Sequence, residues 1–171
     1  MSAQHRVRRQ QLIRQAEGYL ELGMAQHALD VLSHGDEDGS HSGHILFLRG
    51  EALKELGRFE EAIEPLRRAS EVAPSRIPTW LSLGWCYKRV GRIDLAIESL
   101  EEAISVEPKE ALIHYNLACY WSLAGNKRRA LQFLSQAIDL DEAYRDRVGN
   151  ESDFDPIRDD PAFRALTSVI V

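Results

Sequence analysis

The sequence predicts an all-α fold, a right-handed α-solenoid of four helix pairs followed by a C-terminal capping helix. Glycine, alanine and leucine each recur every 34 residues, in one register, through four units. The recurring residues are Gly23, Gly57, Gly91 and Gly125, then Ala28, Ala62, Ala96 and Ala130, then Leu32, Leu66, Leu100 and Leu134. A fixed period of about 20 to 50 residues is typical of solenoids, in which each unit packs on its neighbours. Solenoids generally bind other proteins, so the period narrows the function to a class.

Each unit has the pattern of two amphipathic helices joined by a glycine turn. In the third unit, Leu83 and Tyr87 lie at helical spacing, and the period resumes at Ala96 after Gly91. Gly84 lacks a side chain, so we expect two helix axes to approach closely there. We expect Gly91 to adopt the positive φ that often ends a helix.

The third unit resembles the tetratricopeptide repeat, whose pattern is W-x2-L-G-x2-Y, then A-x3-F, then P. The matching residues are Trp80, Leu83, Gly84, Tyr87, Ala96 and Pro108, with Leu100 in place of the phenylalanine. The second unit keeps most of the pattern, the fourth keeps its register, and the first is the weakest match. The resemblance implies a single domain of four repeats, at about residues 9–42, 43–76, 77–110 and 111–142.

The first unit departs from the pattern at Gly35. Glycine, serine and acidic residues fill the segment GDEDGSHSG, which starts there and cannot be helical throughout. We therefore expect the second helix of this unit to end near His34, with a mobile loop to about Gly43.

Residues 143–171 have the features of a capping tail. Asp155-Pro156 and Asp160-Pro161 are each expected to start a short helix, with aspartate as the N-cap and proline as the first helical residue. An apolar face is expected from Phe154, Ile157, Phe163 and Leu166. The string DFDPIRDDPAFRAL is similar to the tail that follows the last repeat in many bacterial tetratricopeptide proteins, which implies that the array ends here.

Charge and hydropathy exclude several classes of function. The net charge is −6, which argues against nucleic acid, because binding it requires Lys and Arg to neutralise phosphates. No apolar run approaches the roughly 20 residues that span a bilayer, and the N-terminus has no secretory apolar segment. We therefore expect a cytoplasmic protein without a membrane partner. Cys86 and Cys119 are expected to be two buried free thiols, with a single disulfide as the alternative.

The resemblance also implies a concave groove lined by the first helix of each repeat. Its register selects a set of candidate partner-binding residues. They are His44, Phe47, Glu51, Leu81, Trp85, Lys88, Arg89, Leu112, Tyr115, Asn116 and Cys119. We expect Phe47, Trp85 and Tyr115 to be exposed aromatic anchors for a protein or peptide ligand. The alternatives are that these rings belong to the core, or that the tail fills the concave face.

The charges in this register segregate along the chain. The first two repeats contribute four acidic residues, Glu17, Glu21, Glu51 and Glu55, whereas the third contributes Lys88 and Arg89. The expected ligand therefore carries apolar anchors, with basic residues at one end and acidic residues at the other. The cationic fork with which some family members grip a chaperone's terminal carboxylate is absent.

Catalytic and metal sites have little support in the sequence. His34, His41 and His44 flank an acidic loop, but their spacing fits no defined metal site. His114 and Cys119 are five residues apart on one helix, so they do not face each other as a base and nucleophile must. We expect His114 to be a hydrogen-bonded residue at the edge of the core, and we expect no enzyme activity, metal or cofactor.

The predicted function is a non-catalytic protein–protein interaction module, acting as a scaffold, adaptor or assembly factor. Two alternatives remain open: a self-assembling structural homo-oligomer, and a secretion-type chaperone. Fold-level analogy supplies the functional class and nothing finer.

Overall fold

The computed structural model describes residues 3–34 and 42–168, and every regular element in those ranges is a helix. The all-α prediction is therefore confirmed. The chain divides into two compact units, Met1–Val90 and Gly91–Val171, and each has its own packed helices.

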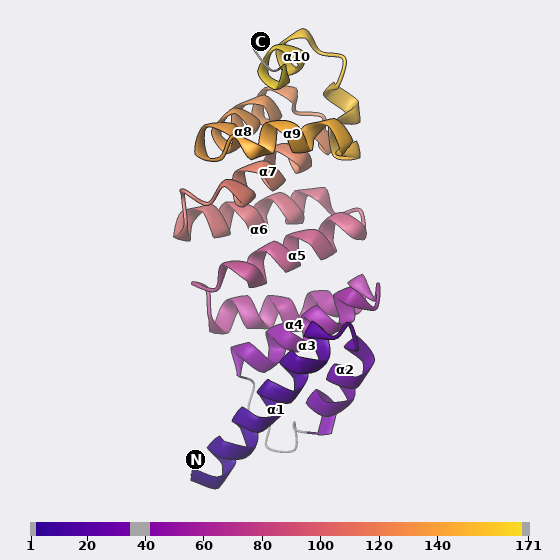
Figure 1. Ribbon diagram of the computed structural model, residues 1–171, viewed down its shortest axis with the longest axis vertical. Coiled ribbons are helices and arrows are strands. Elements are labelled where there is room, and N and C mark those ends of the chain that lie inside the picture. Colours follow the sequence, from indigo (N-terminus) through magenta and orange to yellow (C-terminus); the bar gives the residue numbers. More distant parts are fainter. Residues whose placement is uncertain (1–2, 35–41, 169–171) are drawn as a thin grey trace. The chain divides into compact units, whose positions relative to one another are not determined.

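The N-terminal unit holds two helical hairpins and one further helix. Its helices are α1 (Ala3–Glu21), α2 (Ala25–His34), α3 (Gly43–Glu55), α4 (Phe59–Val72) and α5 (Ile77–Arg89), as labelled in Figure 1. Each helix packs on the next one along the chain, and α3 also contacts both α1 and α5. α2 ends at His34, as predicted. The predicted mobile loop falls on residues 35–41, which lie outside the described residues.

The C-terminal unit holds three long helices and a tail of short ones. The long helices are α6 (Ile93–Val106), α7 (Ala111–Leu123) and α8 (Lys127–Leu140). The tail comprises α9 (Ala143–Arg147), the 3-10 helices η2 (Val148–Asn150) and η3 (Ser152–Ile157), and α10 (Pro161–Thr167). Within this unit α6 and α8 both pack on α7, while η3 lies along α7 and α9 and α10 contact α8 (Figure 1).

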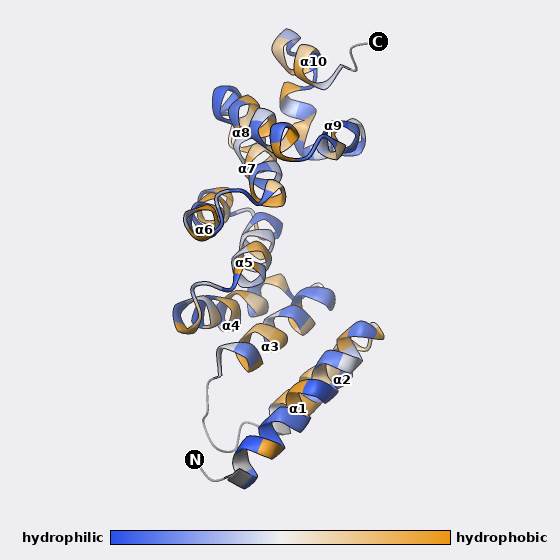
Figure 2. Ribbon diagram, turned by 60° about the vertical axis from the view of Figure 1, so that its left-hand side comes forward, coloured by the Kyte–Doolittle hydropathy of each residue, from blue (hydrophilic) through white to orange (hydrophobic). Residues whose placement is uncertain are grey.

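The recurring alanines and leucines form the core of the repeats. Ala28, Ala62, Ala96 and Ala130 have no exposed surface, and neither do Leu32, Leu66, Leu100 and Leu134. Burial of a leucine side chain contributes about 1.5–3 kcal/mol, so this set supplies much of the stability. The second helices of the hairpins carry hydrophilic residues on their other side, and Figure 2 shows this alternation around α4 and α6.

Glycine has two structural roles in the repeats. The turn glycines Gly23, Gly57, Gly91 and Gly125 have φ between 69° and 79°, which confirms the expectation for Gly91. Gly50 allows a close approach, because a Cβ there would lie 2.4 Å from Cγ of Leu66 on the partner helix. Gly50 stands 34 residues before Gly84, so the reason given for Gly84 is observed at the equivalent position of the previous repeat.

The tail is anchored by its apolar face and by a capped helix. Phe154, Ile157 and Phe163 are buried, as predicted, and Leu166 is half-buried. The Asp160 carboxylate accepts hydrogen bonds from the backbone of Ala162 and Phe163, and therefore caps α10 as expected. An ion pair from Lys127 Nζ, 2.6 Å from Asp160 Oδ2, ties this cap to α8. Lys127 and these backbone donors lower the pKa of Asp160.

The other predicted helix start in the tail is wrong. Asp155 and Pro156 lie inside η3, and the cap of that helix is Glu151, whose carboxylate accepts from the Asp153 amide at 3.2 Å. Asp155 instead pairs with Arg158 at 2.9 Å. Pro156 has no backbone N–H to donate, and hydrogen bonds on either side of it close the turns, from the Phe154 amide to the Glu151 carbonyl and from the Arg158 amide to the Asp155 carbonyl.

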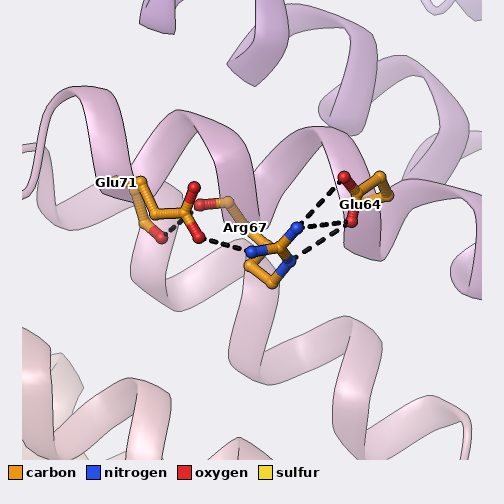
Figure 3. A network of polar contacts seen from close by, with 4 residues as sticks. Glu64, Arg67 and Glu71 are labelled. Carbon is orange, nitrogen blue, oxygen red and sulfur yellow. Dashed lines mark hydrogen bonds and ion pairs between the residues drawn. The ribbon is translucent and has the colours of Figure 1, made fainter.

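The outer side of α4 carries an exposed charge network. Arg67 pairs with Glu64 and with Glu71, one turn to either side (Figure 3). These side chains are largely solvated, so the network contributes little to stability. Across the described ranges, no helix has both the length and the apolar character needed to cross a membrane.

Candidate functional site

The first helices α1, α3 and α5 of the N-terminal unit present a joined set of side chains. We call this surface the N-terminal face. It comprises Glu17, His44, Phe47, Glu51, Lys54, Arg76, Leu81, Trp85 and Lys88. A contact between Glu17 and His44 links α1 to α3. A hydrogen bond from Lys54 to the buried Ser82 links α3 to α5.

The link between α1 and α3 joins His44 to Glu17. His44 Nε2 lies 3.0 Å from Glu17 Oε1, and both side chains are partly exposed. Burial and the nearby Arg76 guanidinium lower the pKa of His44, against the opposing effect of Glu17. The contact is therefore mainly a hydrogen bond at neutral pH and becomes an ion pair only when His44 is protonated.

The link between α3 and α5 is made by Lys54. Its ammonium group donates to both carboxylate oxygens of Glu51, at 2.8 and 2.9 Å, and to Ser82 Oγ at 3.1 Å. Cys86 lies beneath this group, fully buried, and burial raises the pKa of its thiol to about 11. Cys86 is a free thiol, as predicted, and is kept in the unreactive protonated form at neutral pH.

Two aromatic rings on this face are stacked with cations. The Arg76 guanidinium lies 5.0 Å from the centre of the Phe47 ring, and Lys88 Nζ lies 5.0 Å from that of Trp85. Such contacts orient the ring and the cation by electrostatic attraction. Trp85 keeps 41% of its surface exposed, and Phe47 is half-buried. The face therefore presents apolar rings edged with positive charge.

Arg89, a candidate groove residue, contacts the start of α4. Its guanidinium lies 4.6 Å from the centre of the Phe59 ring, at the first residue of α4. Arg76 was missed by the sequence analysis because it precedes α5 and does not belong to the helical register of the groove. A long cationic side chain immediately before a helix that starts with Ile77-Pro78 is the signal that was available.

In the C-terminal unit the candidate residues on α7 are largely covered by the tail. Tyr115 is 6% exposed, and its ring contacts those of Tyr144, with centroids 4.8 Å apart, and Phe154, 5.7 Å apart and edge-on. Cys119 is buried, and its sulfur lies within 4.8 Å of carboxylate oxygens of Glu151 and Asp153. The expected exposure of Tyr115 is therefore wrong.

The physical reason is the path of the tail, because η3 lies along the side of α7 that carries Tyr115. The filled face left open as an alternative in the sequence analysis is thus observed in this unit. Burial raises the pKa values of Tyr115 and Tyr144, so both phenols are neutral. Leu112 and Asn116 are half-buried.

His114 has the structural role that the sequence predicted. It is 6% exposed, and its ring nitrogens lie 2.8 Å from the Pro108 carbonyl oxygen and 3.3 Å from Gln136 Oε1. These two contacts fix the imidazole between α8 and the turn before α7. The loop considered for metal binding falls mostly on residues 35–41, outside the described residues.

Comparisons with known proteins agree on the type of fold. The family described as "Tetratricopeptide repeat" matches residues 43–76 and 77–110. No curated protein sequence matches the chain.

Among solved structures, MamA residues 41 to the end from Desulfovibrio magneticus RS-1 is 20% identical. The match covers 88% of this chain and 84% of that one, with a TM-score of 0.74. A second MamA structure is 22% identical, with 77% of each chain covered and a TM-score of 0.73. YrrB, described as a TPR protein with an unusual peptide-binding site, is 22% identical over 80% of this chain and 71% of its own, with a TM-score of 0.72. At this level of identity the similarity concerns the fold.

Proposed function

We propose that this tetratricopeptide-repeat protein is a non-catalytic interaction module that holds a segment of a partner protein on its N-terminal face. The observation that carries the proposal is the exposed ring of Trp85 on α5, with the half-buried Phe47 on the neighbouring helix α3. Large aromatic side chains on a fixed surface are the usual anchors of protein interfaces. In the cell the module would act as a cytoplasmic scaffold or assembly factor.

The polar links across the face support this proposal. Lys54 joins Glu51 to Ser82, and Glu17 joins His44, so three helices present their side chains in one arrangement before any partner arrives. A preorganised surface loses less entropy on binding than a mobile one. The peptide-binding site attributed to YrrB supports the same class of function by analogy of fold.

A selection from a peptide library tests the proposal. The full chain, immobilised, is used to select peptides from a random library, and each enriched peptide is then measured against the Trp85→Ala variant. We expect Trp85→Ala to weaken binding about tenfold or more, as for an interface hot spot. Val106→Ala is a matched control, because Val106 on α6 is 43% exposed, close to the 41% of Trp85.

Two outcomes would contradict this function. Enriched peptides that bind Trp85→Ala and the wild type equally well would remove the N-terminal face as the site. A wild-type oligomer that Trp85→Ala dissociates, measured by sedimentation velocity, would make self-assembly the function of the face.

A further inference from the structure

A cluster of metal-binding side chains lies between α7 and the start of η3. The Cys119 sulfur comes from α7, and the carboxylates of Glu151 and Asp153 come from the cap and the first turn of η3. These three residues have ligand atoms that all lie within 4.8 Å of one another. In a tetrahedral zinc site, with metal–sulfur bonds of about 2.3 Å and metal–oxygen bonds of about 2.1 Å, the ligand atoms are about 3.5 Å apart. Side-chain movements of about 1 Å would therefore bring the cluster around one ion.

Burial separates this cluster from the acidic groups of an ordinary protein surface. Cys119 is 2% exposed, Asp153 is 7% exposed and Glu151 is half-buried. A buried carboxylate requires hydrogen bonds or an opposite charge. The Glu151 carboxylate accepts a hydrogen bond from the Asp153 amide at 3.2 Å, and a carboxylate has about four acceptor sites. Glu151 can therefore keep its role as the cap of η3 and bind a cation as well.

Tyr115 adds a buried hydroxyl that is directed at the cluster. It stands one turn before Cys119 on α7 and is 6% exposed. Its phenol interacts electrostatically with Cys119, Glu151 and Asp153, which places the hydroxyl beside all three. No hydrogen bond involves this hydroxyl within residues 3–34 and 42–168. The cluster therefore has a polar neighbour whose hydrogen-bonding capacity is unused.

Ser122 supplies a second polar group on the same side of α7. It stands three residues after Cys119, has no exposed surface, and its Oγ lacks a hydrogen-bond partner among the described residues. Helical side chains lean toward the N-terminus, so this hydroxyl leans toward the turn of Cys119. At the equivalent positions of the second repeat, Lys54 reaches Glu51 in the same direction. Buried polar atoms without partners are rare and indicate an ion or a water that completes their hydrogen bonds.

The charges around the cluster are not balanced by the protein alone. Glu151 and Asp153 bring two carboxylates, and Arg147 is a cation that acts on the neighbouring phenol. Arg158 is engaged elsewhere, because it pairs with Asp155 and donates to backbone carbonyl oxygens. Once the thiol has lost its proton, a divalent ion would neutralise the negative charge that Arg147 leaves uncompensated.

We propose that Cys119, Glu151 and Asp153 bind one Zn²⁺ ion, which fastens the tail to α7. A thiolate ligand favours Zn²⁺ over Mg²⁺ and Ca²⁺. On binding, the S–H bond of Cys119 breaks, the proton passes to water, and a sulfur–zinc bond forms without any change of oxidation state. Three protein ligands leave the fourth position to a water molecule, for which Tyr115 and Ser122 are hydrogen-bonding partners.

The zinc site lies within the C-terminal unit and does not depend on what the N-terminal face binds. No metal was expected from the sequence, because Cys119 is far from the two carboxylates along the chain. Only the path of the tail, in which η3 packs on α7, brings the three ligands together.

Titration of the full chain with Co²⁺ tests the site, because Co²⁺ substitutes for Zn²⁺ and its bonds to thiolate sulfur absorb in the near ultraviolet. The chain is first freed of metal by dialysis against EDTA and then titrated, and Zn²⁺ is added afterwards to displace the Co²⁺. We expect a sulfur–cobalt absorption band that saturates at a single ion per chain and disappears as Zn²⁺ is added. This competition also gives the dissociation constant for Zn²⁺.

Matched variants assign the band to the cluster. Cys119→Ala should abolish it, whereas Cys86→Ala removes the other buried thiol and should leave it unchanged. Asp153→Asn should weaken Zn²⁺ binding about tenfold or more, because it replaces a charged ligand with a neutral amide. Asp159→Asn makes the same charge change at an exposed position of the tail and should leave the affinity within about twofold.

Thermal unfolding provides a second readout, which a merely weakened fold would not reproduce. Saturating Zn²⁺ should raise the unfolding midpoint of the wild type and of Cys86→Ala by several degrees and leave that of Cys119→Ala unchanged, because an ion stabilises only the state that binds it. A wild type without the sulfur–cobalt band, or a band that survives in Cys119→Ala, would overturn the site. Equal Zn²⁺ affinities of the wild type and Asp153→Asn would overturn it as well.

Discussion

Phe47 and Tyr115 occupy equivalent positions in repeats that start 68 residues apart, yet their surroundings differ. Phe47 is half-buried, with the guanidinium of Arg76 over its ring. Tyr115 is almost fully buried beneath Tyr144 and Phe154 of the tail. The repeat register therefore predicts which residues share a helix side, but it does not predict whether that side is occupied.

The largest expected effect is a difference in stability between two variants, one that removes the buried Phe154 ring and one that removes the exposed Trp85 ring. Phe154→Ala removes a fully buried ring and should lower the free energy of unfolding by about 3–5 kcal/mol. Trp85→Ala removes a ring with 41% of its surface exposed and should cost less than about 1 kcal/mol. Urea denaturation followed by circular dichroism measures both. Equal losses would mean that Trp85 belongs to the core and that the N-terminal face is not a free surface.

Tyr115→Ala, like Phe154→Ala, removes a buried ring. The exposed anchor that the sequence predicted at this position would contribute little to stability. The burial of Tyr115 now predicts a loss similar to that of Phe154→Ala, because each ring packs on the other. A stable Tyr115→Ala variant would show that the tail does not depend on this contact.

The next effect concerns the thiol beneath the N-terminal face. With its pKa raised to about 11 against an ordinary value of 9.0, Cys86 has roughly 100-fold less thiolate at neutral pH. In a Cys119→Ala background, Ellman's reagent should therefore react at least that much more slowly with the native chain than with the chain in urea. Rapid reaction of the native chain would show that α3 and α5 separate readily, so that the face is not preorganised.

A smaller effect is expected from the link between α3 and α5. Lys54→Met removes the contacts to Glu51 and Ser82 and should destabilise the chain by about 1 kcal/mol, because the side chains are only partly buried. Adding Glu51→Gln should restore part of the loss, since it removes the carboxylate left without its cation. A change in the midpoint of urea unfolding measures both variants. No change in either variant would remove the link as a source of order in the face.

The smallest effect is the titration of His44. Its pKa lies below the ordinary 6.5, so as pH falls below that value the unfolded chain binds a proton more readily than the folded chain. Stability from this site is complete above pH 6.5 and decreases on acidification. NMR titration should show a further decrease in the pKa for Glu17→Gln and an increase for Arg76→Met. A wild-type pKa above 6.5 would mean that the pair with Glu17 outweighs burial.

The repeats were predictable because their physical requirements recur in the sequence. A glycine at each turn must have positive φ, and small residues must stand where helices meet, so Gly57 and Ala62 identify their hairpin without any structure. His114 was predicted correctly for a similar reason, since a histidine in a tryptophan position needs hydrogen-bond partners. These are local constraints, and each is visible within one 34-residue window.

The state of the candidate site was not predictable in the same way. Whether Tyr115 is open depends on the path of a segment some forty residues later in the chain, where η3 packs on α7 and Phe154 contacts the Tyr115 ring. The place of Arg76 over Phe47 depends on a side chain outside the repeat register. Contacts of this kind are specific to one chain, so a periodic pattern does not contain them.

The seating of η3 on α7 has a consequence for lengthening the protein by design. An extra hairpin inserted before residue 143 would have to present a tyrosine and a small buried residue where Tyr115 and Cys119 now stand, or Phe154 would lose its site. A copy of residues 77–110 offers Leu81 and Trp85 at those places instead. Engineered arrays that end in this tail should therefore keep residues 111–168 together, because the tail packs on α7.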